Sequence, residues 1–248
     1  MKQSQWLQGN FKLLLGGAPV EMQFNIPAKP VKLRRMLPVF QQLTNKFVEI
    51  SADAAEKSGT KVSCRKGCGA CCRQSVPIAE VEAFKVARLI ENLPEPRRSK
   101  IKQRFENASR HFRQNGWFEK LQNCPDDEEL KKIALEYFYE GVPCPLLENE
   151  SCSIHRERPL ACREFLVSSP PENCADPSPE TVDVIPQPVK PSNTLRRIGH
   201  IRKFGKINFM PLVFALDWVE NNSEDFPEKT GDEWMADFFG DLTGKEIS

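Results

Sequence analysis

Four cysteines fall within nine residues of the sequence, in the stretch CRKGCGACC at positions 64–72. Thiolates are preferred ligands of zinc and of iron–sulfur clusters. The C-x2-C step from Cys68 to Cys71 lets one tight turn direct two sulfurs at one ion. Gly67 and Gly69 allow the backbone to adopt the sharp conformations that wrapping around a metal requires. The stretch therefore predicts a metal site.

Cys72 differs from its neighbours because it directly follows Cys71. Side chains of adjacent residues diverge, so both sulfurs could bind one tetrahedral ion only with strain. Cys72 is therefore expected to serve a second ion, to bridge two ions or to remain a free thiol.

A second cysteine group lies between residues 144 and 174. Turn residues between Cys144 and Cys152 predict a small ribbon, and Pro159 is expected to start a short helix that carries Cys162, because proline suits the first helical position. Four plus four thiols would suit two four-cysteine zinc sites, or one iron–sulfur cluster with thiols to spare. The candidate metal ligands are Cys64, Cys68, Cys71, Cys72, Cys144, Cys152, Cys162 and Cys174.

Other polar residues accompany these cysteines. Cations next to a thiolate lower its pKa and offset the negative charge of a thiolate-bound metal, although each of these residues could equally be an ordinary surface charge. His155 lies three residues after Cys152, a workable ligand spacing, but a single histidine in a polar turn is more often a surface or packing residue. Cys124 lies outside both groups and is expected to be structural. The flanking cations are Arg65, Lys66, Arg73, Arg158 and Arg163.

The overall composition is that of an ordinary globular protein, with 40% apolar and 28% charged residues and a net charge of +1. This charge gives no general field that would recruit nucleic acid or a membrane. Residues 1–20 lack the apolar core and cleavage site of a signal peptide, and the later apolar stretch 209–216 is far shorter than the ~20 residues that span a bilayer. We therefore expect a cytoplasmic protein, where clustered cysteines serve more often as metal ligands than as disulfides.

Periodicity predicts a mainly α fold with a small irregular or β cysteine-rich metal-binding region. Residues 11–27 read as two strands around a Gly-Gly turn, a possible N-terminal hairpin. The proline-rich stretch 168–191 is expected to be an irregular loop. Helices are expected, from apolar spacing and proline boundaries, over residues 33–57, 77–94, 96–121, 126–139, 193–204, 212–221 and 232–242.

The chain is expected to form a single domain over residues 1–248. Residues 1–30 would be an N-terminal hairpin or extension, residues 60–175 a cysteine-cluster core, and residues 176–248 a proline-rich loop with C-terminal helices. The stretch 96–121 is basic and contains interleaved aromatic residues, as in some nucleic-acid-binding helices. A solvated helix with an apolar core face explains it equally well, so no nucleic-acid partner is expected.

The two cysteine groups together resemble a known family. CRKGCGACC, followed by CPLL and by CSIHRERPLACREF, is similar to the YkgJ-type cysteine-cluster family, described as a zinc- or iron-chelating domain. The resemblance covers roughly residues 60–175 and implies that the seven cysteines from Cys64 to Cys162, other than Cys124, are ligands, with Cys174 added to them. His155 departs from the family, which usually has tyrosine there.

Three functions are compatible with these observations. The first is a metal-binding protein whose cysteine groups converge on one zinc or iron centre. The second is an iron–sulfur-dependent enzyme that modifies a protein side chain, because some flagellin lysine N-methylases carry a similar box. The third is an interaction module with structural zinc and a protein partner.

The sequence contains no complete motif of a known enzyme class. The C-x3-C-x2-C spacing is also that of radical-SAM enzymes, but Ala70 stands where that family usually has an aromatic residue, and the chain lacks repeated strand–helix units. No Walker A loop, H-E-x-x-H or G-x-S-x-G motif occurs in the sequence.

Overall fold

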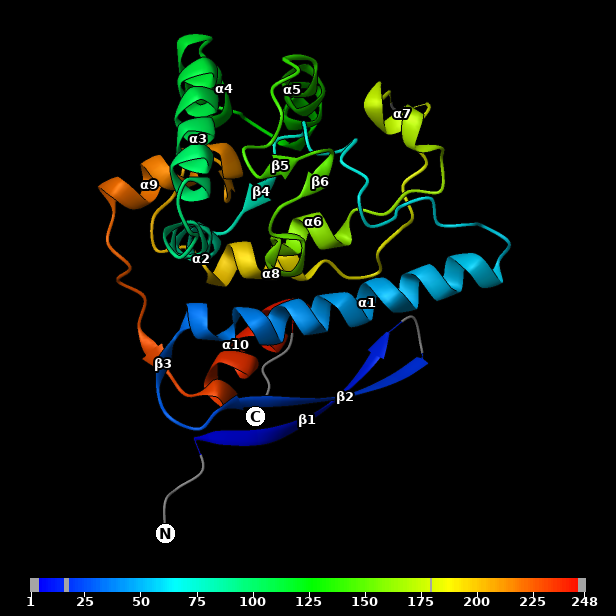
Figure 1. The fold of residues 1–248 in the computed structure, drawn as a ribbon. Helices are drawn as coiled ribbons and strands as arrows, with labels where there is room; N and C mark the ends of the chain where they lie inside the picture. Colours follow the sequence, from blue (N-terminus) through cyan, green and yellow to red (C-terminus); the bar gives the residue numbers. More distant parts are fainter. Residues whose placement is uncertain (1–4, 16–17, 179, 245–248) are drawn as a thin grey trace.

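The computed structural model describes residues 5–15, 18–178 and 180–244. Figure 1 shows a tiered molecule: a hairpin lies at one end, two helices pack on it, and the remaining helices lie on the far side of these two. The hairpin consists of β1 (Trp6–Leu15) and β2 (Ala18–Pro27), and the two helices are α1 (Leu37–Lys57) and α10 (Gly231–Thr243). The expected mainly α fold and the N-terminal hairpin are confirmed.

The hairpin and these two helices enclose the lower core. Alternate residues of β2, namely Met22, Phe24 and Ile26, are buried, as expected for a strand with one face on a core. Phe40 of α1 stacks on Phe238 of α10 with 4.2 Å between ring centroids. A 3-10 turn at Leu33–Met36 leads into α1, and the short strands β3 (Val31–Lys32) and β8 (Glu228–Lys229) pair beside it.

The upper core lies among α3 (Arg97–Gln114), α4 (Trp117–Gln122) and α5 (Asp127–Tyr139). Phe112 stacks on Tyr137 with 4.1 Å between centroids. The single helix expected over residues 96–121 is wrong, because Gly116 adopts φ +74° and breaks it into α3 and α4.

Helix α2 (Glu80–Glu91) separates the two cores. Val81 and Phe84 face the lower core, whereas Val86 and Ile90 face the upper core. The helix expected over residues 77–94 is shorter in the structure, because residues 77 and 78 form β4 (Pro77–Ile78), which pairs with β7 (Met210–Pro211).

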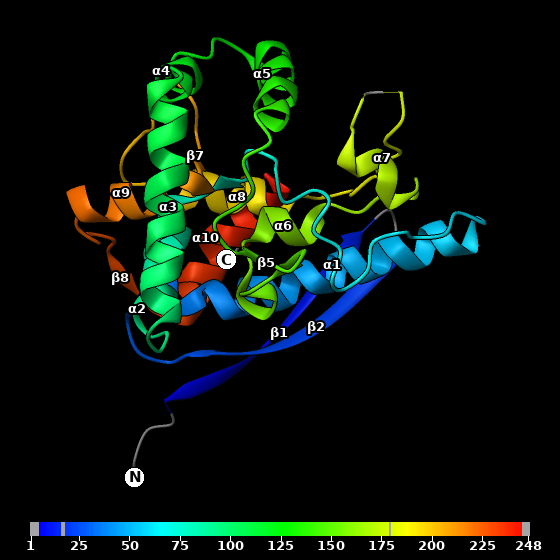
Figure 2. The same cartoon turned by 45° about the horizontal axis from the view of Figure 1, so that its top comes forward.

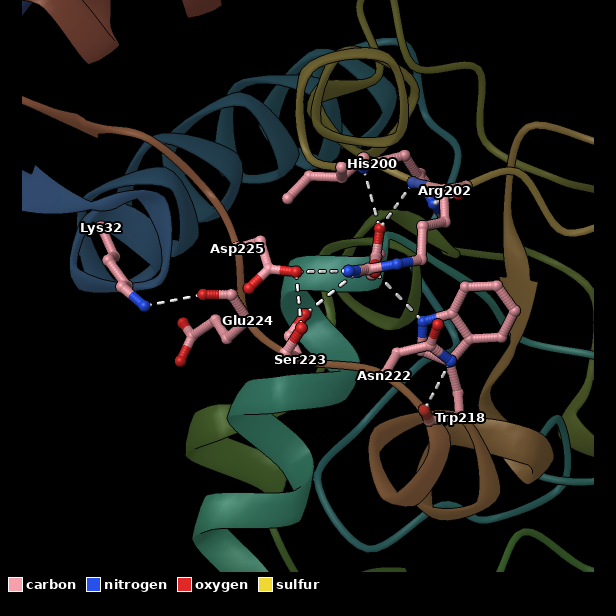
Figure 3. Close-up of polar contacts among 10 residues, drawn as sticks. Lys32, His200, Arg202, Trp218, Asn222, Ser223, Glu224 and Asp225 are labelled. Carbon is pink, nitrogen blue, oxygen red and sulfur yellow. Dashed lines mark hydrogen bonds and ion pairs between the residues drawn. The ribbon is translucent and has the colours of Figure 1, made fainter.

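A buried carboxylate at the start of α2 connects three distant segments. Glu80 is fully buried and accepts hydrogen bonds from the backbone N–H groups of Ile201 (2.8 Å) and Arg202 (3.0 Å). The Arg202 guanidinium (2.8 Å) and the Trp218 indole (3.2 Å) donate to the same carboxylate. Figure 3 shows Arg202 between Asp225 and Trp218, so the segments around residues 201, 218 and 225 meet at α2.

The C-terminal half differs from expectation at two helix ends. Helix α8 (Pro191–Ile198) stops at Gly199, short of the expected residue 204, because the Gly199 carbonyl accepts a hydrogen bond from the N–H of Val81 (3.0 Å). The proline-rich stretch contains a short helix, α7 (Pro171–Ala175). A 3-10 turn at Leu212–Phe214 leads into α9 (Ala215–Asn221). None of the helices in the described ranges has the length and apolar character that crossing a bilayer requires.

Candidate metal centre

The first cysteine group lies in the loop between α1 and β4, where short turns follow one another. The N–H of Cys68 donates to the carbonyl of Arg65 (3.2 Å), and that of Cys72 donates to Gly69 (2.9 Å). Gly67 lies within the first of these turns with φ +88°, a conformation that glycine adopts without steric cost. The predicted tight turn spanned Cys68 to Cys71, whereas the hydrogen-bonded turns of the loop run from Arg65 to Cys68 and from Gly69 to Cys72.

A small ribbon packs directly on this loop. It consists of β5 (Leu147–Glu148) and β6 (Ser151–Cys152), as expected for the stretch between Cys144 and Cys152. A side chain at Gly69 would place its Cβ 2.7 Å from the carbonyl oxygen of Glu150, so only glycine permits this approach. Arg73 forms an ion pair with the same Glu150 at 3.0 Å.

Backbone hydrogen bonds join the two cysteine groups. The N–H of Cys144 donates to the carbonyl of Cys72 at 2.7 Å, and the N–H of Ser63 donates to the carbonyl of Val167 at 2.9 Å. The N–H of Val167 in turn donates to Sγ of Cys64 at 3.4 Å. Segments some 70 to 100 positions apart in the sequence are thus held in register by the main chain.

Helix α6 (Leu160–Glu164) carries Cys162, and Pro159 precedes it as expected. The helix packs against α1, and the two lie together in both Figure 1 and Figure 2. Its first N–H, at Leu160, donates to Glu82 of α2 at 2.9 Å. The other carboxylate oxygen of Glu82 accepts from Ala79 at 3.0 Å, so this buried residue caps two helices at once.

Two further residues of α6 hold its surroundings together. Arg163, only 4% exposed, donates to the carbonyl of Arg158 (3.0 Å), to the side chain of Asn45 (2.8 Å) and to the carbonyl of Arg156. Glu164 accepts from the N–H of Ser192 at 2.6 Å, which connects α6 to α8. Arg163 was expected to act as a cation beside the thiols, but its hydrogen bonds make it chiefly an organiser of the chain.

Sequence patterns missed Glu82 and Glu164, because acidic residues within short helical segments look like solvent-exposed positions. Only the third position of Glu82 in its helix, where a carboxylate can reach back to the N-cap backbone, could have indicated its role.

All eight candidate cysteines line one cavity of about 600 Å³. The ninth, Cys124, lies in the upper core instead, where its thiol donates to the carbonyl of Asp126 at 3.3 Å. Cys71 lies centrally among these thiols: its proximity raises the pKa of thiols from both groups, although less than burial does. Those thiols are Cys64, Cys144, Cys152, Cys162 and Cys174.

Burial dominates the titration of these thiols. It raises the pKa of Cys144 to about 12 and that of Cys174 to about 11, and it raises the pKa of Cys162 well above its usual range. The pKa of Cys71 is also raised, first by a hydrogen bond with Cys72 and then by burial. Without metal, these four thiols are therefore protonated at neutral pH.

The flanking cations lower thiol pKa values, as expected, but burial raises these pKa values by more. Arg158 lowers the pKa of Cys64 and Cys152, yet desolvation is the larger effect and the pKa of both thiols is raised. His155 also lines the cavity, and its Nε2 contacts the guanidinium of Arg158. Burial and, to a smaller extent, the positive charge of Arg158 lower the pKa of His155, so its ring is neutral near pH 7.

The donor set fits zinc or iron in kind, since eight thiols share one cavity and their backbone is fixed by hydrogen bonds. Within the described ranges, no three histidine, cysteine, aspartate or glutamate side chains already form a group that could hold a metal ion. Closing a coordination shell thus requires side-chain rotation, for example to break the hydrogen bond between Cys71 and Cys72.

Comparison with known proteins identified one family. Residues 63–181 match the CxxCxxCC family model, whose description is "Putative zinc- or iron-chelating domain". No curated protein and no solved structure matched the chain. The matched segment contains all eight cavity-lining cysteines and ends within the proline-rich stretch. Residues 63–181 of this chain therefore correspond to the domain that the CxxCxxCC family model describes.

Proposed function

We propose that the protein binds zinc or iron at one polynuclear centre to which both cysteine groups contribute. The observation that supports this is the single cavity lined by Cys64, Cys68, Cys71, Cys72, Cys144, Cys152, Cys162 and Cys174. One tetrahedral ion needs four thiolates, so a shared set of eight suits two zinc ions or an iron–sulfur cluster with spare thiols.

The centre would organise the polypeptide around it. The loop from α1 to β4 has turns in place of regular structure, and few large apolar side chains hold it. Thiolate–metal bonds would connect this loop to the ribbon β5–β6, to α6 and to α7. Metal binding in such a region contributes free energy of folding directly.

Metal analysis of the full chain, purified without oxygen from its native host, tests this proposal. We expect two or more equivalents of zinc in colourless protein, or iron with a visible absorbance band in brown protein. Metal-free protein from such a preparation, or a single equivalent, would contradict a polynuclear centre.

Cys72→Ser tests the nuclearity separately. In a polynuclear centre Cys72 supplies the second ion, so its loss should halve the metal content or abolish the colour. In a mononuclear site Cys72 is the spare thiol beside Cys71, and metal content should stay unchanged. We expect the first result.

An iron–sulfur-dependent enzyme that modifies a protein side chain is the second candidate. The cavity favours it, because about 600 Å³ exceeds what a closed coordination shell occupies and lies within the range of ligand pockets. Structural zinc sites are closed, whereas catalytic metal sites keep an open position. Anaerobic iron reconstitution, followed by electron paramagnetic resonance of the reduced protein, separates this candidate from an interaction module with structural zinc, which would remain silent.

A further inference from the structure

The cavity extends beyond the cysteines. Its remaining wall comes from the chain between Val184 and Arg196, which includes the start of α8, and from residues 74–77 before α2. Besides apolar residues such as Val184 and Ile185, this wall carries several polar side chains. Its polar side chains are Gln74, Ser75, Gln187, Lys190, Ser192, Asn193 and Arg196.

Two partly exposed side chains of this wall have buried polar atoms without hydrogen-bond partners. Both amide atoms of Gln187, Nε2 and Oε1, are withdrawn from solvent and make no hydrogen bond with any described residue. The hydroxyl of Ser75 is in the same situation. Leaving a buried polar group unpaired costs about 1–3 kcal/mol, and native proteins rarely accept it except at functional sites.

The charge of the wall is positive. Lys190 and Arg196 line it, and Arg196 lies with its guanidinium 5.4 Å from the ring centroid of Phe209 while one of its nitrogens donates to Asn193. Glu164 of α6, the carboxylate that also lines the cavity, already accepts from Ser192. A guanidinium held by a ring and an amide is oriented to meet a planar anion.

From these observations we infer that the cavity binds a small organic carboxylate next to the cysteine cluster. Its carboxylate meets Arg196 and Lys190, and a second polar group pairs with the amide of Gln187. The inference rests on the proposed metal centre, because the cysteines form the opposite wall. The bound molecule would lie between the two walls, within reach of an open coordination position.

Calorimetric titration of the metal-loaded full chain tests this inference. The probes are acetate, succinate and citrate, with succinamide as a neutral molecule of the same size as succinate. We expect saturable binding of at least one carboxylate and none of succinamide. Arg196→Gln and Gln187→Leu should each weaken binding about tenfold or more, because a charge-assisted or buried hydrogen bond is lost.

Matched variants show whether the effect is local. Arg197→Gln changes the next residue of α8, whose guanidinium pairs with Asp241 of α10 and which does not line the cavity, so binding should be unchanged. Gln187→Glu keeps the shape of the side chain and adds a negative charge, so it should abolish carboxylate binding while thermal unfolding confirms that the protein remains folded.

Several results would overturn the inference. These are no binding of any carboxylate to protein that retains its metal, equal binding by Arg196→Gln and wild type, or tighter binding of inorganic phosphate than of every carboxylate. Loss of metal from the wild-type protein during the titration would instead count against the proposed metal centre. Metal analysis of every sample distinguishes these two failures.

Discussion

Cys124 and Cys174 are both buried thiols, and their neighbours differ. Cys124 contacts apolar side chains of the upper core, whereas Cys174 lines the cavity, and its pKa is raised first by burial and then by the nearby thiols Cys64, Cys71 and Cys68. Burial alone therefore does not identify a ligand. What distinguishes the two thiols is the presence of other sulfurs close enough to interact electrostatically.

Replacing the central thiol should have the largest effect on metal content. Cys71→Ser removes the sulfur that influences five others, so we expect loss of most of the bound metal. Cys124→Ser should retain full metal content and lose about 1 kcal/mol of stability through its core position. Metal analysis and urea unfolding measure the two effects. Metal loss in Cys124→Ser with retention in Cys71→Ser would refute the assignment of ligands.

Metal affinity should rise with pH. The metal-free state holds protons on thiols such as Cys144, with a pKa of about 12, and Cys174, with a pKa of about 11, whereas ligand thiolates hold none. Each proton released on binding makes affinity increase about tenfold per pH unit below these pKa values. Competition with a chromogenic chelator between about pH 6 and pH 8 measures the slope. A flat profile would show that these thiols are not ligands.

Several elements were predictable because local signals determined them. Helix α5 matches its expected range, since Asp126 caps it by accepting from the N–H of Glu129 at 2.8 Å. The ribbon between Cys144 and Cys152 and the helix after Pro159 were also predictable from turn residues and proline. These signals act over a few residues, so they can be recognised in the sequence before the fold is known.

Features set by tertiary contact were not predictable. A lone glycine within a helical pattern, such as Gly116, is tolerated in many helices, and here it ends one. The partners of the terminal helix are of this kind: α10 packs on β2 and α8, and Trp234 and Phe238 bury their side chains in the lower core. The cavity and the role of Gln187 likewise depend on segments that meet only in space.

The contact between the cysteine loop and the ribbon should be sensitive to one methyl group. Gly69→Ala would place Cβ 2.7 Å from the carbonyl of Glu150, so the ribbon must move away and metal content should fall. Gly59→Ala is the matched control: it adopts φ +87° and meets no neighbouring atom, so it should cost about 1 kcal/mol of backbone strain without loss of metal. Equal metal content in both variants would indicate that the ribbon does not position the cysteines.

At the scale of the molecule, the two cores and the cysteine region should respond differently to metal removal. The lower core of β2, α1 and α10 is held by apolar packing, whereas the loop of residues 58–76 is held by turns and by the proposed metal. Chelation should therefore increase tryptic cleavage at Arg65, Lys66 and Arg73 well before cleavage within α10. Mass spectrometry of timed digests locates the cuts. Uniform cleavage along the chain would contradict this division.

The hydrogen bond from Cys144 to Cys72 has a consequence for how the protein is made. During synthesis the first cysteine group leaves the ribosome 72 residues before Cys144, a delay of roughly 4–14 s at about 5–20 residues per second. The early thiols are therefore synthesised well before their partners, and the residues of α2 to α5 must fold before the two groups can meet. If both groups hold one metal centre, as we propose, the centre can be completed only after Cys144 has been synthesised, and the nascent chain would need a reducing environment until then.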